Sequence, residues 1–185
     1  DLSSPCIVRD MNKCILCGRC EKVCSNIQTV NALTKIGRGF STKLGCAYDA
    51  DMKKSPCVGC GQCTLVCPVG ALVEKDDTQK LLDMLADDSL FVTCQIAPSV
   101  RVSLAEAFGA EIGTFEEGKM VTALKMLGFR KVFDVNMGAD FTVKEEAEEL
   151  VERIKQNKNL PQFSSCCPAW FKFVQNHFKA YEDSL

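Results

Sequence analysis

The stretches CILCGRCEKVC (residues 14–24) and CVGCGQCTLVC (residues 57–67) hold eight of the chain's 13 cysteines and share the spacing C-x2-C-x2-C-x3-C. Secreted scaffolds held by disulfides are usually shorter and scatter their cysteines among loops. Two dense runs in a chain of 185 residues instead indicate metal ligation in a reducing compartment. We therefore expect two metal centres in the first part of the chain and a cytoplasmic location.

This spacing is typical of bacterial ferredoxins, in which three cysteines of a run hold one 4Fe–4S cluster and the fourth reaches across to the other cluster. The expected ligands of the first cluster are Cys14, Cys17, Cys20 and Cys67. Those of the second are Cys57, Cys60, Cys63 and Cys24. Zinc is the alternative, but zinc sites usually use separate C-x2-C pairs. Ser25 departs from the pattern, because a proline often follows the fourth cysteine.

Composition narrows the possible partners. A hydrophobic content of 46% is ordinary for a folded core. The net charge is −2 and there is no long basic run, so we expect no nucleic-acid partner. No apolar run approaches the roughly 20 residues of a membrane span. The chain shows no secretory leader and does not begin with Met, which leaves open that it is processed or is a fragment with an upstream extension.

After the charged stretch EKDDTQK (74–80) the sequence changes to alternating strands and helices. The expected strands are 89–97, 131–138 and 161–166. The expected helices are 98–109, 118–129, 142–157 and 167–178. Such alternation indicates a largely parallel sheet with helices packed on it. We therefore expect an α+β ferredoxin-like domain with two clusters at 1–78, followed at 79–185 by an α/β domain that is only part of a catalytic domain.

Three later segments carry a resemblance to a known family. They are QIAPSVRVSLAEAFG (95–109), FDVNMGADFTVKEEAEELVERI (133–154) and FSSCCPAW (163–170). From about residue 6 to its last residue the chain resembles the iron–iron (FeFe) hydrogenases, with Ser164 where their first signature has Thr. The resemblance implies an oxidoreductase that interconverts protons, electrons and H2. Its H-cluster would combine a 4Fe–4S unit with a di-iron site that carries CO and cyanide.

The adjacent cysteines of FSSCCPAW would then have different roles. The resemblance implies that Cys167 is a ligand of the 4Fe–4S part of the H-cluster. It implies that Cys166 stays a free thiol and passes protons to the bridging amine of the di-iron site. Neighbouring residues of a strand point to opposite sides, which suits one ligand and one acid–base group. The alternative is that both are buried core cysteines, a common fate for this residue.

Residues 142–157 form an amphipathic pattern in which Glu146, Glu149 and Arg153 border the apolar stripe. On spacing alone, Glu149 and Arg153 are an i,i+4 pair that stabilises the helix. The resemblance implies a proton route instead, in which Glu146 exchanges protons with Cys166 and the other two lead outward. It also implies that Pro98 and Ser99 line the di-iron site, where Ser99 donates to a cyanide. Taken alone, Ser99 is equally well explained as a helix cap.

No cysteine follows Cys167, whereas two later motifs supply the other three H-cluster ligands in the family. We therefore expect the chain to be completed by the remainder of a hydrogenase or by a complementary subunit. A ferredoxin or an NADH-linked subunit is the expected redox partner. Two other functions stay open: an iron–sulfur electron-transfer subunit without its own catalytic site, and a hydrogenase-like redox or H2 sensor.

Three cysteines and the single histidine lie outside these motifs. Cys94 falls in an apolar strand, where a buried and inert thiol is expected. Cys6 and Cys46 lie outside the ligand spacing, and we do not expect them to bind metal. His177 follows Phe173 at helical spacing, which favours a packing or surface role.

Overall fold

The computed structural model describes residues 1–185 and divides them into two compact units. The first contains residues 1–76 together with 159–185, and the second contains residues 77–158. The expected domains were residues 1–78 and 79–185. Residues 159–185 differ from the expectation, because they group with the first unit. Phe173 packs against the buried core of that unit, and the Asn176 side-chain amide donates to the Pro56 carbonyl at 3.2 Å.

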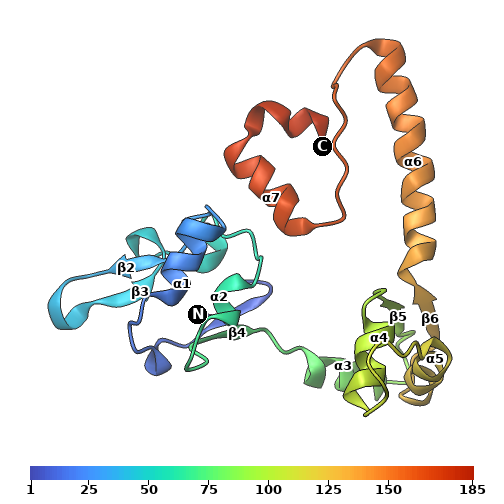
Figure 1. The fold of residues 1–185 in the computed structure, drawn as a ribbon, viewed down its shortest axis with the longest axis horizontal. Coiled ribbons are helices and arrows are strands. Elements are labelled where there is room, and N and C mark those ends of the chain that lie inside the picture. The colour runs from blue at the N-terminus through green and yellow to red at the C-terminus, as the bar shows by residue number, and fades with distance from the viewer. The chain divides into compact units, whose positions relative to one another are not determined.

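The first unit is built from short elements (Figure 1). Strand β1 (Ile7–Arg9) pairs antiparallel with β4 (Leu72–Glu74), and β2 (Thr34–Ile36) with β3 (Lys43–Gly45). The short helices α1 (Arg19–Lys22) and α2 (Gln62–Leu65) contact each other. A π-helical turn, η2 (Val23–Ile27), continues α1. The remaining elements of the unit are the 3-10 turns η1 (Met11–Lys13), η3 (Gly39–Ser41), η4 (Ala47–Asp49) and η5 (Met52–Lys54), the helix α7 (Pro168–His177) and the final turn η6 (Lys179–Ser184).

The two cysteine runs fold as an internal repeat. Gly18 precedes α1 with φ of +75°, and Gly61 precedes α2 with φ of +76°. Only glycine adopts this left-handed conformation without a steric cost, so both runs turn sharply into their helices. The third cysteine of each run, Cys20 or Cys63, is then buried on its helix.

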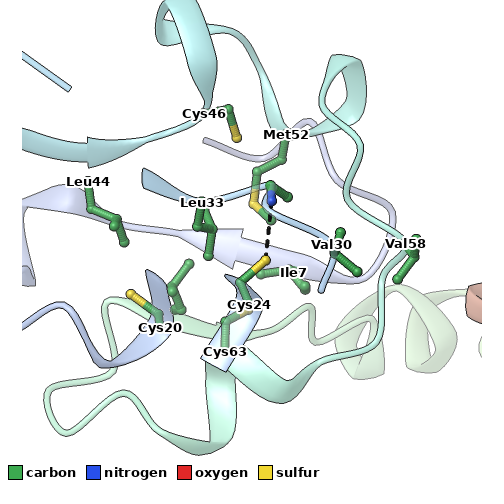
Figure 2. Close-up of a cluster of buried hydrophobic side chains, with 12 residues drawn as sticks. Ile7, Cys20, Cys24, Val30, Leu33, Leu44, Cys46, Met52, Val58 and Cys63 are labelled. Atoms are coloured by element: carbon green, nitrogen blue, oxygen red, sulfur yellow. Dashed lines mark hydrogen bonds between the residues drawn. The ribbon is translucent and has the colours of Figure 1, made fainter. Parts of the chain in front are cut away.

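Cysteine supplies part of the core of this unit. Figure 2 shows Cys20, Cys24 and Cys63 among apolar side chains that include Ile7 and Leu33. Leu44, Met52 and Leu72 belong to the same buried cluster. A small unit with so few large apolar residues buries little surface. A group bound by the buried thiols would therefore add to the stability of this unit.

The second unit contains the parallel pair β5 (Thr93–Ile96) and β6 (Lys131–Asp134). Its helices are α3 (Thr78–Leu85), α4 (Val100–Ala107), α5 (Glu117–Met126) and α6 (Val135–Gln156). Helices α5 and α6 contact β6, and α4 contacts α5. The buried Arg101 of α4 forms ion pairs with Glu117 and Asp134, so it ties α4 to α5 and to the start of α6.

Two expectations about the second half are wrong. The expected strand 161–166 is not a strand, because Phe163 donates its N–H to the Ser184 carbonyl at 2.7 Å, in the C-terminal turn, rather than to a sheet. Residues 135–141, expected as strand and loop, begin helix α6 instead. The carboxylate of Asp134 accepts from the Asn136 N–H at 2.8 Å and caps the helix there. Helix α3 was not expected from the charged boundary.

No helix in the structure is both long enough and apolar enough to cross a bilayer.

Candidate metal centres

The four cysteines expected to bind the first cluster line one cavity. It is bordered by Cys14, Cys17, Cys20 and Cys67. Apolar side chains also line this cavity, among them Leu16, Val66 and Leu72. Three of the thiols come from the first run and its helix α1. The fourth comes from the residue that follows α2 and Val66, and the contact between the two helices brings it within reach.

The other four cysteines of the two runs line a second cavity. It is bordered by Cys24, Cys57, Cys60 and Cys63. Apolar side chains also line this second cavity, among them Ile7, Val30 and Met52. Each cavity thus takes three thiols from one run and one from the other. This is the grouping that the ferredoxin ligand assignment requires.

Backbone N–H groups point at four of these sulfurs. Such donors favour a thiolate over a thiol, because a hydrogen bond to a charged acceptor is the stronger one. They also suit an iron–sulfur cluster, whose reduction potential is set partly by hydrogen bonds to sulfur. The donors and acceptors, with their N···S distances, are Leu16 to Cys14 at 3.4 Å, Gly59 to Cys57 at 3.4 Å, Ala32 to Cys24 at 3.3 Å and Ala71 to Cys67 at 3.2 Å.

Cys20 and Cys63 are buried, and no positively charged side chain is among the groups that shift their pKa. Burial, together with a smaller effect of neighbouring cysteines, raises the pKa of Cys20 to about 11 and that of Cys63 to about 12. Burial also raises the pKa of Cys67, but hydrogen bonds from the backbone of residues 69–72 outweigh it, so the net pKa is lowered. Bound iron would supply the missing charge, because a coordinating thiol is deprotonated outright.

The donor set fits an iron–sulfur cluster better than zinc. Zinc needs four ligands around one ion. No group of three or more Cys, His, Asp or Glu side chains in the structure is placed to hold one metal ion together. The four cysteine ligands of a 4Fe–4S cluster bind four different irons, so their sulfurs need not converge. Both cavities are lined by four thiols and by no histidine or carboxylate.

Gly59 and Leu16 occupy the same place in the two runs, one residue before the second cysteine. Their φ values are +72° and +56°, and each N–H donates to the first sulfur of its run. A Cβ on Gly59 would lie 3.0 Å from the Cys6 sulfur. Gly59→Ala should therefore lower the free energy of unfolding of the cluster-loaded chain by about 1–2 kcal/mol, from left-handed strain alone. Denaturant unfolding measures this.

Leu16→Ala is the matched control, because it adds no strain and removes a partly exposed side chain. We expect it to cost less than about 0.5 kcal/mol. The double variant Cys6→Ala/Gly59→Ala separates the steric contact from the strain. An unfolding free energy for Gly59→Ala equal to that of the unmodified chain would contradict this account of the loop.

The twin cysteines lie at the turn into α7. Both are exposed in this chain, so the alternative of buried core cysteines does not hold here. Cys167 is the N-cap residue of α7, its N–H donates to the Ser165 hydroxyl at 3.1 Å, and Pro168 follows as the first helical residue. Cys167 lines a pocket of about 780 Å3 together with Cys57 and Cys60 of the second cavity. Cys166 is not part of this lining.

The predicted proton-route residues lie on α6. Arg153 donates from Nε and Nη2 to one Glu149 oxygen at 3.0 and 2.6 Å, so the i,i+4 pair forms. Glu146 is half-buried and Glu149 is exposed. Glu146 belongs to the second unit and Cys166 to the first.

Pro98 and Ser99 form an exposed turn between β5 and α4. Ser99 is the N-cap residue of α4, but its hydroxyl makes no capping hydrogen bond. Its carbonyl instead accepts from the N–H and hydroxyl of Ser103, both at 3.1 Å. The Ser99 hydroxyl therefore forms no hydrogen bond to the end of the helix.

Sequence reasoning missed two residues of the pocket beside Cys167. Lys172 lines it, and its charge counteracts the burial that raises the pKa of Cys57. Cys6 lines it too, with its sulfur 3.7 Å from the Gly59 carbonyl oxygen. Both residues reach the pocket because segments far apart in the sequence pack together. No local sequence pattern therefore predicts their position.

The other residues outside the motifs have structural surroundings. Cys46 is fully buried, 3.9 Å from a guanidinium nitrogen of Arg9. Cys94 is only partly buried in β5, and burial raises its pKa. The His177 ring packs on Phe173 with the ring centres 4.7 Å apart, which fits the expected packing role.

Two known protein families match this chain, one in each of its two parts. The family described as "Iron only hydrogenase large subunit, C-terminal domain" matches residues 91–185. The family described as "4Fe-4S dicluster domain" matches residues 13–71. The second match covers both cysteine runs, and the first covers the segment from β5 to the last residue.

Curated relatives match over most of the chain. The NADP-reducing hydrogenase subunit HndD of Solidesulfovibrio fructosivorans is 41% identical over 95% of this chain and 31% of its own length. Iron hydrogenase 1 of Clostridium pasteurianum is 39% identical over 100% of this chain and 32% of its own length. The periplasmic [Fe] hydrogenase large subunit of Nitratidesulfovibrio vulgaris is 42% identical over 51% of this chain. The chain thus spans about a third of the first two relatives.

Proposed function

Because the chain belongs to the iron-only hydrogenase family, we propose that it is the cluster-bearing first part of an enzyme that catalyses 2H⁺ + 2e⁻ ⇌ H2. The observation that carries this proposal is the pocket that Cys57 and Cys60 share with Cys167. It sets the second cluster cavity beside the residue expected to hold the catalytic cofactor. Electrons would therefore pass from the first cavity to the second and on to Cys167.

The two cavities hold the electron relay in this proposal. Cys14, Cys17, Cys20 and Cys67 bind one 4Fe–4S cluster. Cys57, Cys60, Cys63 and Cys24 bind the other. Each cluster, when bound, accepts and releases one electron. The crossed ligands fix the two cavities next to each other, and the backbone N–H donors stabilise the thiolate form of the ligands.

The remaining site residues belong to the catalytic part, residues 79–185 in this proposal. Cys167 holds the 4Fe–4S part of the H-cluster, and the missing part of the protein supplies the other three cysteines. Pro98 and Ser99 line the di-iron site with its CO and cyanide ligands, toward which the uncommitted Ser99 hydroxyl can donate. The family match to residues 91–185 supports this assignment.

Cys166, Glu146, Glu149 and Arg153 carry protons in this proposal. The Cys166 thiol exchanges a proton with the reacting site and with the Glu146 carboxyl. Glu146 is half-buried and Glu149 exposed on the same helix, so they offer successive positions from the interior to solvent. Arg153 fixes the outer carboxylate through two N–H donors.

The complete enzyme tests this function. The isolated, cluster-loaded chain should evolve no H2 from reduced methyl viologen and should show no infrared bands of metal-bound CO or cyanide. Both should appear once the missing part is supplied and the cofactor is matured. Such bands in the isolated chain would show that the ligand count is wrong. If the complete protein holds its relay clusters but shows no infrared bands of CO or cyanide, it is an electron-transfer subunit. If it shows these bands but relays a signal instead of turning over H2, it is a sensor.

Location and partners follow from the same assignment. The two dense cysteine runs favour a reducing compartment such as the cytoplasm. One relative is described as periplasmic, so family membership alone does not set the compartment. The redox partner would be a ferredoxin or an NADH-linked subunit, and the structural partner the remainder of the hydrogenase.

A further inference from the structure

An open hollow adjoins the cavity of the first cluster. Its volume is about 560 Å3, and Arg19, Lys22, Ile27, Leu65 and Cys67 are among its lining residues. Cys67 also lines the first cluster cavity, as do the neighbouring Val66 and Pro68. A molecule seated in this hollow would therefore touch an expected cluster ligand directly.

The rim of the hollow is positively charged. Arg19 and Lys22 are exposed at the two ends of α1. The ammonium group of Lys35 lies close by, 3.5 Å from where a Cβ on Gly18 would be. Between residues 13 and 43 lie six of the 22 Lys and Arg residues but only one of the 24 acidic residues, so this segment carries +5 in a chain of net charge −2. Lys13 and Lys43 of this segment pair with Asp10 and Asp49. The positive charge beside the hollow is therefore that of Arg19, Lys22 and Lys35.

Apolar side chains stand beside these cations. Ile27 is 71% exposed and Leu65 is 74% exposed, and both line the hollow. Exposed apolar groups within a charged rim are typical of protein interaction sites. A phosphate backbone or a small anion would use the cations but would leave the apolar groups in water.

We propose that this hollow docks an acidic one-electron carrier protein, which reduces the first cluster by way of Cys67. The proposal rests on the proposed function, because it takes Cys67 as a cluster ligand. One electron leaves the carrier and one enters the cluster, and no bond forms or breaks. The cations attract and orient the carrier, and Ile27 and Leu65 provide the contact that excludes water.

Stopped-flow reduction tests the docking surface. The cluster-loaded chain is mixed anaerobically with a chemically reduced, acidic [2Fe–2S] ferredoxin at low ionic strength. Arg19→Glu/Lys22→Glu should lower the second-order rate constant about tenfold or more, because rim charges act mainly on association. The rate for the unmodified chain should fall as salt is added. Lys80→Glu/Lys125→Glu makes the same change of charge at exposed sites of the second unit and should stay within about twofold of the unmodified chain.

A second reductant separates docking from effects on the cluster itself. A small uncharged photoreductant, such as a deazaflavin radical, should reduce the unmodified chain and Arg19→Glu/Lys22→Glu at equal rates. If the variant is slowed equally with both reductants, its charges act on the cluster and the docking proposal is overturned. It is also overturned if the variant is not slowed with ferredoxin, or if salt has no effect. Failure of the unmodified chain to bind clusters would instead overturn the proposed function, and iron analysis reveals that before mixing.

Discussion

Cys20→Ser is expected to halve the iron content of the isolated chain, from about eight atoms in two 4Fe–4S clusters to about four. Cys20 is buried on α1 and lines only the first cavity of the two. Serine is a poor substitute for a thiolate at that position. Cys24→Ser should also lose one cluster, but the other one, because Cys24 lines the second cavity although it belongs to the first run. Iron and sulfide analysis gives the number lost, and EPR of the reduced protein shows which signal remains.

Cys94→Ser is the matched control for these two variants. Cys94 is partly buried in β5 and lines neither cavity, so both clusters should stay in place. Loss of the same EPR signal in Cys20→Ser and Cys24→Ser would rule out the crossed ligand sets. A chain that binds zinc and contains no labile sulfide would rule out the iron–sulfur assignment altogether.

In the complete enzyme, Cys167→Ser should prevent H-cluster assembly, whereas Cys166→Ser should leave the cofactor in place and lower turnover about 10²- to 10⁴-fold. Cys167→Ser replaces a thiolate ligand with a weaker one. Cys166→Ser removes a proton carrier, a contribution typically of this size, because a serine hydroxyl holds its proton far more tightly than a thiol with a pKa of about 8.5. Infrared bands of CO and cyanide report the cofactor, and H2 evolution reports turnover.

Two further variants test whether Cys166 acts through its proton. Glu146→Gln keeps the shape of the side chain and removes its exchangeable proton, so it should resemble Cys166→Ser. Cys166→Asp should recover part of the activity, because a carboxyl group can titrate. The relay clusters should still be reduced in both. Normal turnover in Cys166→Ser, or loss of the cofactor there with retention in Cys167→Ser, would reverse the two roles.

The cysteine runs were predictable because their information is local. Each run places three thiols on one tight loop, and Gly18 and Gly61 adopt the positive φ that such a turn needs. The helices α4, α5 and α7 were likewise predictable, because the spacing of apolar residues and the positions of proline and glycine indicate where they lie. These features depend on residues fewer than about 12 positions apart, which is the range that patterns of this kind report.

Two failures were local: the Asp134 carboxylate caps α6 seven residues earlier than the expected helix start at 142, and α3 begins within the charged stretch. The others depended on distant partners. Residues 161–166 have the composition of a strand, but Phe163 pairs with the C-terminal turn at Ser184. Packing of Phe173 and Asn176 on the first unit joins segments more than 100 residues apart, and it creates the pocket beside Cys167. Lys172 and Cys6 enter that pocket for the same reason, so no periodicity could have identified them.

The exchange of fourth cysteines between the two runs also restricts when the clusters can be made. Cys67 borders the first cavity and Cys24 the second, so both cavities need residues from both runs. A nascent chain that has left the ribosome only as far as residue 56 holds no complete set of four thiols. It offers three cysteines of one set and a single cysteine of the other. If these sets are the cluster ligands, the second set is complete once Cys63 has emerged and the first only once Cys67 has emerged, so the site that begins first in the sequence is completed last.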